Sequence, residues 1–283
     1  MSIQIHPTAV VAKEAKLSEG VSIGPYTLIG PYVTLKENVK VHSHVVIEGR
    51  TTIGAETEVF PFVGLGLPPQ SIHYKGEDSA LEIGEKCLIR EHVTIHRGTA
   101  HGHMKTTVGN ECFIMIGSHI GHDCIIGNHV IMANNATLGG HVIVGDYVNI
   151  GGLAAIHQFV RIGAHAMISG TAGVNEDVIP FGMIMASRSK LEGLNLIGMK
   201  RRGFDREEIH ALRNAFKLLS RKHKGTLESK LDQIQETLGN AQTVRELLTF
   251  IKGSPERRLS LPDDEWDYAI SKSTQEPLRA ANA

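Results

Sequence analysis

Four residues capable of proton transfer lie in one regular stretch, SHIGHDCIIGNHVIMANNATLGGH: His119, His122, Asp123 and His141. An imidazole is a natural general base near neutral pH, and a neighbouring carboxylate can orient it and stabilise the imidazolium. The N–H of a glycine such as Gly140 can stabilise an oxyanion, because no side chain obstructs the approach. A base and an oxyanion donor on one face are the minimal equipment for acyl transfer to a hydroxyl or an amine.

Two other interpretations of these histidines are open. They could be exposed residues on a polar strand, and the spacing alone does not decide against this. Trios of imidazoles also bind Zn²⁺, although no segment of the chain has the local spacing of a strong zinc motif. The grouping of His119, His122, His141 and His157 favours a functional site, and we expect it to hold no metal.

The elements that position these residues follow from a six-residue period. An aliphatic residue recurs at every sixth position over residues 5–65 and 83–95 and, after a shift of one residue, over 108–174. This period matches neither the 3.6 residues of a helical turn nor the alternation of a simple strand. It is typical of a parallel β-helix, in which short flat strands meet at corners.

The position two residues before each aliphatic is mostly small or β-branched, and both positions should point inward from one strand. All three cysteines, Cys87, Cys112 and Cys124, occupy this inner position. We therefore expect them to be small buried hydrophobic residues rather than ligands or redox groups. A sparse, odd number of cysteines also fits a reducing cytoplasm.

The period predicts which residues meet. If three hexads close one triangular coil, residues 18 apart stack at about 4.8 Å. His122 then stacks on Gly140, and Asp123 stacks on His141. The next rung of the same face begins with two more polar residues, His157 and Gln158.

Two insertions and a tail interrupt the pattern. Residues 66–80 and 97–106 break the repeat and are expected to be external loops, which on a rigid scaffold are often functional. The repeat ends near residue 190, so we expect a β-helix domain over 1–190 and a helical domain over 191–283.

Helical spacing of apolar residues predicts the elements of this tail. A first helix should begin at Asp205 and be closed by Gly225, and a second should run from Thr226 to Gly239. A third should begin with a capping box of Thr243 and Glu246.

Composition excludes several classes of partner. The 283-residue chain has a formal net charge of −1, which does not indicate nucleic-acid binding. No apolar run reaches the roughly 20 residues of a membrane span, so no integral membrane segment is expected. The N-terminus lacks the features of a signal peptide, which again predicts a cytoplasmic protein.

Five motifs carry a more specific resemblance: TIHRGT, SHIGHDCIIGN, ANNATLGGH, AAIHQF and KRRGF, in this order and followed by a helical tail. Together they resemble the acyl-carrier-protein-dependent UDP-N-acetylglucosamine O-acyltransferases of lipid A biosynthesis, over nearly the whole chain. The resemblance implies a left-handed parallel β-helix with a C-terminal α-helical domain. It also implies a homotrimer with sites between adjacent subunits, and no cofactor, because the acyl chain arrives on the phosphopantetheine of acyl carrier protein.

The resemblance assigns roles residue by residue. It makes His122 the base that takes the proton from the 3-position of the sugar, Asp123 its partner, and the Gly140 N–H the oxyanion donor. Gly170 falls where the family sets the length of the acyl chain, and a glycine there would leave room for a longer 3-hydroxyacyl chain. Residues implied to bind or position the substrates are His96, His119, His141, His157, Gln158, Asn195, Arg201 and Arg202, of which Arg202 lies near nucleotide or carrier.

Three positions depart from the family pattern. Its better-known members carry an aspartate at the position of Ser71 and a lysine at that of His73, both of which face the sugar and its phosphates. Ile197 also replaces an acidic residue in the nucleotide region. The serine motivates a hypothesis that the acceptor is the 3-amino analogue of the UDP-sugar, which would give an amide.

The expected function is transfer of a 3-hydroxyacyl chain from acyl carrier protein to a UDP-amino sugar, with the basic run Lys200-Arg201-Arg202 as a clamp for phosphates or for the acidic carrier. The same run could be an ordinary solvated surface. Three alternatives for the whole chain stay open: a sibling N-acyltransferase or acetyltransferase, a zinc-dependent hydratase of β-helix type, and a non-catalytic solenoid.

Overall fold

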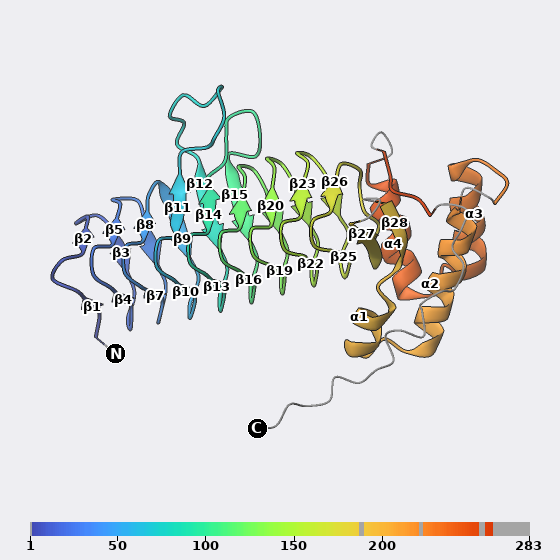
Figure 1. The fold of residues 1–283 in the computed structure, drawn as a ribbon, viewed down its shortest axis with the longest axis horizontal. Coiled ribbons are helices and arrows are strands. Elements are labelled where there is room, and N and C mark those ends of the chain that lie inside the picture. Colours follow the sequence, from blue (N-terminus) through green and yellow to red (C-terminus); the bar gives the residue numbers. More distant parts are fainter. Residues whose placement is uncertain (1, 187–189, 221–222, 255–257, 263–283) are drawn as a thin grey trace.

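The computed structural model describes residues 2–186, 190–220, 223–254 and 258–262. A left-handed parallel β-helix occupies most of the chain, and four helices follow at its C-terminal end (Figure 1). Each strand up to β23 pairs with the strand three positions later in the chain, as β1 does with β4 and β2 with β5. Each coil therefore contributes one short strand to each of three sheets. The fold expected from the six-residue period is confirmed.

We name the sheets A, B and C. Sheet A contains β1 (Gln4–Ile5), β4 (Ser22–Ile23), β7 (Lys40–Val41), β10 (Glu58–Val59), β13 (Leu88–Ile89), β16 (Phe113–Ile114), β19 (Ile131–Met132), β22 (Asn149–Ile150), β25 (Met167–Ile168), β27 (Gly182–Met185) and the antiparallel β28 (Lys190–Leu194). Sheet B contains β2 (Val10–Val11), β5 (Leu28–Ile29), β8 (Val46–Ile47), β11 (Gly64–Leu67), β14 (Thr94–His96), β17 (His119–Ile120), β20 (Thr137–Leu138), β23 (Ala155–Ile156) and β26 (Gly173–Val174). Sheet C contains β3 (Lys16–Leu17), β6 (Thr34–Leu35), β9 (Arg50–Ile53), β12 (Ala80–Ile83), β15 (Lys105–Val108), β18 (Ile125–Ile126), β21 (Ile143–Val144) and β24 (Arg161–Ile162).

The coil length is 18 residues wherever no loop is inserted as far as β26, whereas the last coil, from β25 to β27, takes 16 residues, since Ile168 pairs with Ile184. His119 pairs with Thr137, and Ile120 pairs with Leu138, as the predicted stacking requires. The two insertions leave the end of sheet B: one loop joins β11 to β12 over residues 68–79, and the other joins β14 to β15 over 97–104. Both protrude from the same side of the β-helix (Figure 1).

Small and branched aliphatic side chains fill the interior of the coils. The repeat residues from Ile23 to Val174 are almost completely buried. Cys87, Cys112 and Cys124 are buried free thiols, as predicted, and the Cys124 S–H points at the carbonyl of Gly139, 3.1 Å away. Because the side chains that meet inside each coil are alike, the backbone repeats with little change, and polar residues on the outside can be placed without disturbing it.

Three corners connect the sheets, and the chain turns at each of them. Several non-glycine residues at the corners have left-handed backbone angles, among them Asp123 (φ 59°) and His141 (φ 62°) between sheets B and C. Hydrogen bonds between neighbouring coils hold these strained positions, as when the His141 N–H donates to the His122 carbonyl at 2.9 Å. Each corner therefore forms a column of side chains along the axis.

The helical part contains α1 (Leu196–Arg201), α2 (Arg206–Leu219), α3 (Leu227–Leu238) and α4 (Gln242–Lys252). Asp205 caps α2 as predicted, since its side chain accepts the Glu208 N–H. The prediction that Gly225 closes this helix is wrong, because the chain already leaves the helical conformation at Ser220 (φ −52°, ψ 145°). Thr226 caps α3 as predicted.

The predicted capping box of α4 is also wrong. Its N-cap residue is Ala241, two positions before Thr243, and no side chain of its own caps it. Instead the carboxylate of Glu208, on α2, accepts the N–H groups of Gln242 (2.9 Å) and Thr243 (2.8 Å) and the Thr243 hydroxyl (2.7 Å). A neighbouring helix thus supplies the cap that the sequence pattern placed within α4.

Candidate active site

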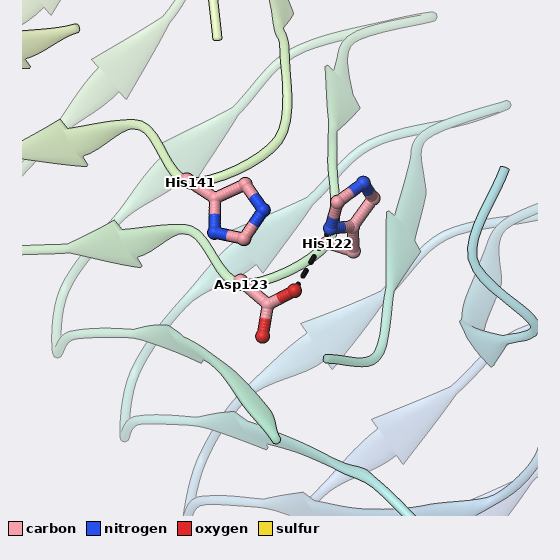
Figure 2. Close-up of side chains that lie close together, drawn as sticks. All are labelled: His122, Asp123 and His141. Carbon is pink, nitrogen blue, oxygen red and sulfur yellow. Dashed lines mark hydrogen bonds and ion pairs between the residues drawn. The ribbon is translucent and has the colours of Figure 1, made fainter. Parts of the chain in front are cut away.

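The corner between sheets B and C gathers the polar residues that the period predicted to meet. β17 leads into His122 and Asp123, and β20, one coil further, leads into Gly140 and His141. Figure 2 shows His122 hydrogen-bonded to Asp123, with His141 on the adjacent coil. The rings of His122 and His141 meet edge to face, with 5.0 Å between centroids.

His122 lies directly against Gly140. A Cβ built on Gly140 would be 2.7 Å from Cε1 and 2.8 Å from Nε2 of the imidazole. Glycine is therefore required there for space and not for backbone angle. Among the described residues, no acceptor is paired with the Gly140 N–H.

Asp123 is fully buried, and its carboxylate accepts four hydrogen bonds. The donors are His122 Nδ1–H (2.8 Å), the Thr99 hydroxyl (2.6 Å), the Thr99 N–H (3.0 Å) and the His103 N–H (2.8 Å). Burial alone would raise the pKa of Asp123, but the hydrogen bonds from His122, Thr99 and His103 outweigh it and lower the pKa to about 2. Asp123 is therefore ionised at neutral pH.

The charge of Asp123 fixes the tautomer of His122. An ionised carboxylate has no proton to give, so the hydrogen between the two groups belongs to Nδ1 of the imidazole. In the neutral ring Nε2 then carries a lone pair. This is the arrangement of a general base held in orientation by a carboxylate.

Three further imidazoles surround this pair in uncharged form. Burial, together with the neighbouring His119 and His122, lowers the pKa of His96 to about 4. Burial and His122 also lower the pKa of His119, whose Nδ1 shares a hydrogen bond with the Thr94 hydroxyl at 2.8 Å. Burial lowers the pKa of His141 against the opposing charge of Asp123. At neutral pH these rings can exchange hydrogen bonds with a polar ligand without repelling a protonated base.

The other predicted residues of this corner lie on the next rung or in the loops. His157 and Gln158 follow β23 and are exposed. Ser71 and His73 lie in the 68–79 loop, where the His73 N–H donates to the Ser71 hydroxyl at 3.3 Å. The His73 ring meets the edge of His101 in the 97–104 loop, so the two loops touch.

The remaining predicted residues lie at the other two corners. Gly170 stands between β25 and β26, at the corner of sheets A and B. Asn195 caps α1 and donates to the His165 carbonyl at 2.9 Å, and Arg202 donates to the Tyr147 carbonyl at 2.9 Å. His165 and Tyr147 belong to the corner of sheets C and A, and Arg201 is exposed in the last turn of α1. Within one chain, Gly170, Asn195, Arg201 and Arg202 therefore lie at different corners of the β-helix from His122.

His122, Asp123 and His141 could also act together as ligands of a metal ion. One ligand atom each from His122, Asp123 and His141 lie within 4.8 Å of one another. The Asp123 oxygens, however, are directed at N–H and O–H donors from Thr99, His103 and His122, and a cation would have to compete with them. The hydrogen bonding is that of a proton-transfer pair.

Sequence reasoning missed the residues that hold Asp123. Thr99, Gly102 and His103 belong to an insertion that breaks the repeat, so the period could not place them on the coil of His122. Thr106, at the start of the next strand, accepts the Asp123 N–H at 2.8 Å. The only signal was a short loop, rich in glycine, ahead of the coil that carries the base.

Comparisons with known proteins identify the relatives of this chain. Residues 177–259 match the model of domain 2 of UDP-N-acetylglucosamine O-acyltransferase, and residues 105–140 match the bacterial transferase hexapeptide repeat. The chain is 51% identical to the acyl-[acyl-carrier-protein]–UDP-N-acetylglucosamine O-acyltransferase of Azorhizobium caulinodans, over 91% of this chain and 95% of that protein. It is also 51% identical to the enzyme of the same name from Caulobacter vibrioides, over 93% and 100%. The crystal structure of LpxA from Acinetobacter baumannii superposes with a TM-score of 0.87 at 38% identity, over 91% of this chain and 99% of that one.

No helix in the described part of the chain is both long enough and apolar enough to cross a membrane.

Proposed function

The chain belongs to the family of acyl-[acyl-carrier-protein]–UDP-N-acetylglucosamine O-acyltransferases, and on this premise we propose that it transfers a 3-hydroxyacyl chain from acyl carrier protein to the 3-position of UDP-N-acetylglucosamine. This would be the first step of lipid A biosynthesis. One observation carries the assignment to this site: the imidazole of His122, oriented by the ionised Asp123, lies against Gly140, whose N–H has no acceptor among the described residues.

The proposed reaction is a direct transfer without an acyl-enzyme intermediate. The 3-hydroxyl oxygen attacks the carbonyl carbon of the thioester while its proton passes to Nε2 of His122. The Gly140 N–H donates to the oxyanion of the tetrahedral intermediate, and Asp123 stabilises the imidazolium. When the intermediate collapses, the carbon–sulfur bond breaks and His122 returns the proton to the departing sulfur. An ester and the free thiol of the carrier result.

Substrate positioning is assigned to the polar residues around the base. His96, His119 and His141 line the corner beside His122, and His157 and Gln158 extend it by one coil. Ser71 and His73 are assigned to the sugar and its phosphates from the adjacent loop. The side chains of all these residues can donate or accept hydrogen bonds to a polar substrate. No metal or other cofactor is required by this chemistry.

We propose that the chain forms a homotrimer, as the resemblance to its family implies, and the position of the remaining residues supports this. Gly170 stands at the A–B corner, while Asn195, Arg201 and Arg202 belong to α1 near the C–A corner. A cyclic arrangement places one corner of a subunit against a different face of its neighbour. We therefore assign the acyl-chain and nucleotide contacts of these residues to sites between adjacent subunits.

The donor is assigned to acyl carrier protein and the location to the cytoplasm. Lys200 and Arg201 lie exposed in the last turn of α1, where they can attract an acidic partner. The three free, buried thiols agree with a reducing compartment.

A direct assay tests the assignment. Purified protein is incubated with a mixture of 3-hydroxyacyl carrier proteins of different chain length and with UDP-N-acetylglucosamine, and the products are identified by mass spectrometry. We expect an O-acylated nucleotide sugar, which His122→Ala does not form. Parallel reactions with acyl-coenzyme A separate this activity from that of a sibling acetyltransferase. Absence of product with every carrier-bound donor would overturn the proposal.

The 3-amino sugar is a second candidate acceptor. The better-known members of the family carry an aspartate at the position of Ser71. Ser71 offers a hydroxyl there instead of a carboxylate, and this hydroxyl accepts the His73 N–H. Competition between the 3-hydroxy and 3-amino nucleotide sugars in one reaction decides between ester and amide. A strong preference for the 3-hydroxy sugar ends this alternative.

A further inference from the structure

The loop over residues 97–104 closes onto the carboxylate of the Asp123–His122 pair. Its carbonyl at Thr99 accepts the N–H groups of Gly102 (3.1 Å) and Met104 (3.2 Å), so the loop is a compact turn. Gly98 donates its N–H to Ala80 at 3.2 Å, which fastens the loop to sheet C. The donors of the turn are therefore fixed by backbone bonds before they reach Asp123.

Three donors of this turn point at the carboxylate. The Thr99 hydroxyl lies 2.6 Å from Oδ2, the Thr99 N–H lies 3.0 Å from Oδ2, and the His103 N–H lies 2.8 Å from Oδ1. Gly102 completes the enclosure, since a Cβ there would stand 2.2 Å from Cγ of Asp123. The carboxylate is thus held on one side by donors and on the other by the ring of His122.

The Asp123 backbone is held independently of its carboxylate. Its φ of 59° is in the left-handed region, and its N–H donates to the Thr106 hydroxyl at 2.8 Å. With the backbone fixed, the donors of the 97–104 loop determine the direction in which the carboxylate faces. That direction sets the orientation and the tautomer of the imidazole.

We propose that Thr99 is a positioning residue for acyl transfer, which acts through Asp123 to keep Nε2 of His122 unprotonated and directed at the acceptor. This inference rests on the proposed function. The Thr99 side chain touches the Asp123 carboxylate and none of the reacting atoms. Its effect is therefore on turnover rather than on substrate affinity.

The substitution Thr99→Val tests the role, because valine keeps the shape of threonine and removes the hydroxyl donor. We expect kcat to fall about 10- to 100-fold, by analogy with hydrogen-bond partners that orient the histidine ligands of metal sites, while KM changes less than about threefold. Thr99→Ser retains the donor and should restore most of the activity. Gly102→Ala, which places a methyl group on the carboxylate, should lower kcat at least as much as Thr99→Val.

The matched control is Thr107→Val, an equivalent change on β15 close to the same loop. It should leave kcat unchanged, and thermal unfolding should show that all variants are folded. In ¹⁵N NMR spectra of histidine-labelled protein, the fraction of His122 with the proton on Nδ1 should fall in Thr99→Val and recover in Thr99→Ser. Assignment of that signal uses its loss in His122→Gln.

Two failures are distinguishable. If the wild-type protein makes no acylated product, the proposed function fails. If the wild-type protein is active and Thr99→Val has an unchanged kcat, or raises only KM, or if Thr99→Ser is as impaired as Thr99→Val, the role of Thr99 is overturned and the proposed function stands.

Discussion

The imidazole of His122 occupies the space that a side chain on Gly140 would need, with Cε1 only 2.7 Å from the position of a Cβ. The contact joins two residues 18 apart in sequence, one coil apart in space. It places the proposed general base directly against the proposed oxyanion donor.

Gly140→Ala should therefore inactivate the enzyme by displacing the imidazole. The new methyl group would force the His122 ring away from Asp123 and from the acceptor, and we expect kcat to fall by about 100-fold or more, as for loss of a general base. Gly30→Ala is the control, since its Cβ at the same kind of corner meets nothing closer than 3.4 Å. Steady-state kinetics of both variants measure the effect, and comparable activity would contradict the contact.

His122→Ala should lower kcat by about 10²- to 10⁴-fold, the range typical of a general base. The side chain is about one-fifth exposed and is not part of the aliphatic core, so thermal stability should change little. Steady-state assays together with circular dichroism separate loss of chemistry from loss of fold. Near-normal turnover by a folded variant would remove His122 from the mechanism.

His96 should make the protein less stable in acid. Its folded-state pKa of about 4 is below the ordinary value of 6.5, so the unfolded chain binds more protons between these values. Its contribution to stability is therefore complete above pH 6.5 and is lost as the pH falls towards 4, on the order of 3 kcal/mol. Urea unfolding of the wild type and of His96→Leu at pH 7 and pH 4.5 measures this. The stability of the variant should depend less on pH, and an identical dependence in both proteins would disprove the assignment.

Glu208→Ala should destabilise the helical part of the chain. The variant removes the acceptor for two N–H groups at the start of α4 and for the Thr243 hydroxyl. Loss of such a cap costs about 1–2 kcal/mol. Glu207→Ala, an exposed change on the same turn of α2, is the control. Equal unfolding free energies for the two variants would argue against capping between helices.

Sites shared between subunits predict complementation. If the chain forms the proposed trimer, His122→Ala and Arg201→Ala should each be inactive alone, but mixed trimers from co-expression should recover part of the wild-type activity, because some sites combine an intact His122 with an intact Arg201. Native mass spectrometry verifies that the trimers are mixed. Mixed trimers without activity would place both residues in the site of one subunit.

The repeat made the central part of this structure predictable. The period alone places His122 beside Gly140 and Asp123 beside His141, because the coils next to the site have no insertion between them and take 18 residues each. It could not place Thr99 or His103, since their loop follows no period and returns to Asp123 through backbone N–H groups that any residue provides.

The helical part was harder to predict for a related reason. Thr243 and Glu246 have the spacing of a capping box, but Glu208 on another helix provides the cap, and local sequence carries no record of that contact. Asn195, by contrast, caps α1 locally, since its side chain accepts the Gly198 N–H at 3.0 Å, but its amide also donates to the His165 carbonyl on another coil, a contact that local sequence does not show.

The 18-residue coil also limits how the chain can change in length. Removing or adding one complete coil on either side of the catalytic rung would leave every remaining ladder paired, and the rod would only become shorter or longer. Deleting a single residue between Asp123 and His141 would turn buried side chains outward and move Gly140 away from His122. Gene segments encoding whole coils are thus the units by which the central part of the rod can change its length, whereas deletions of a single codon within it are not.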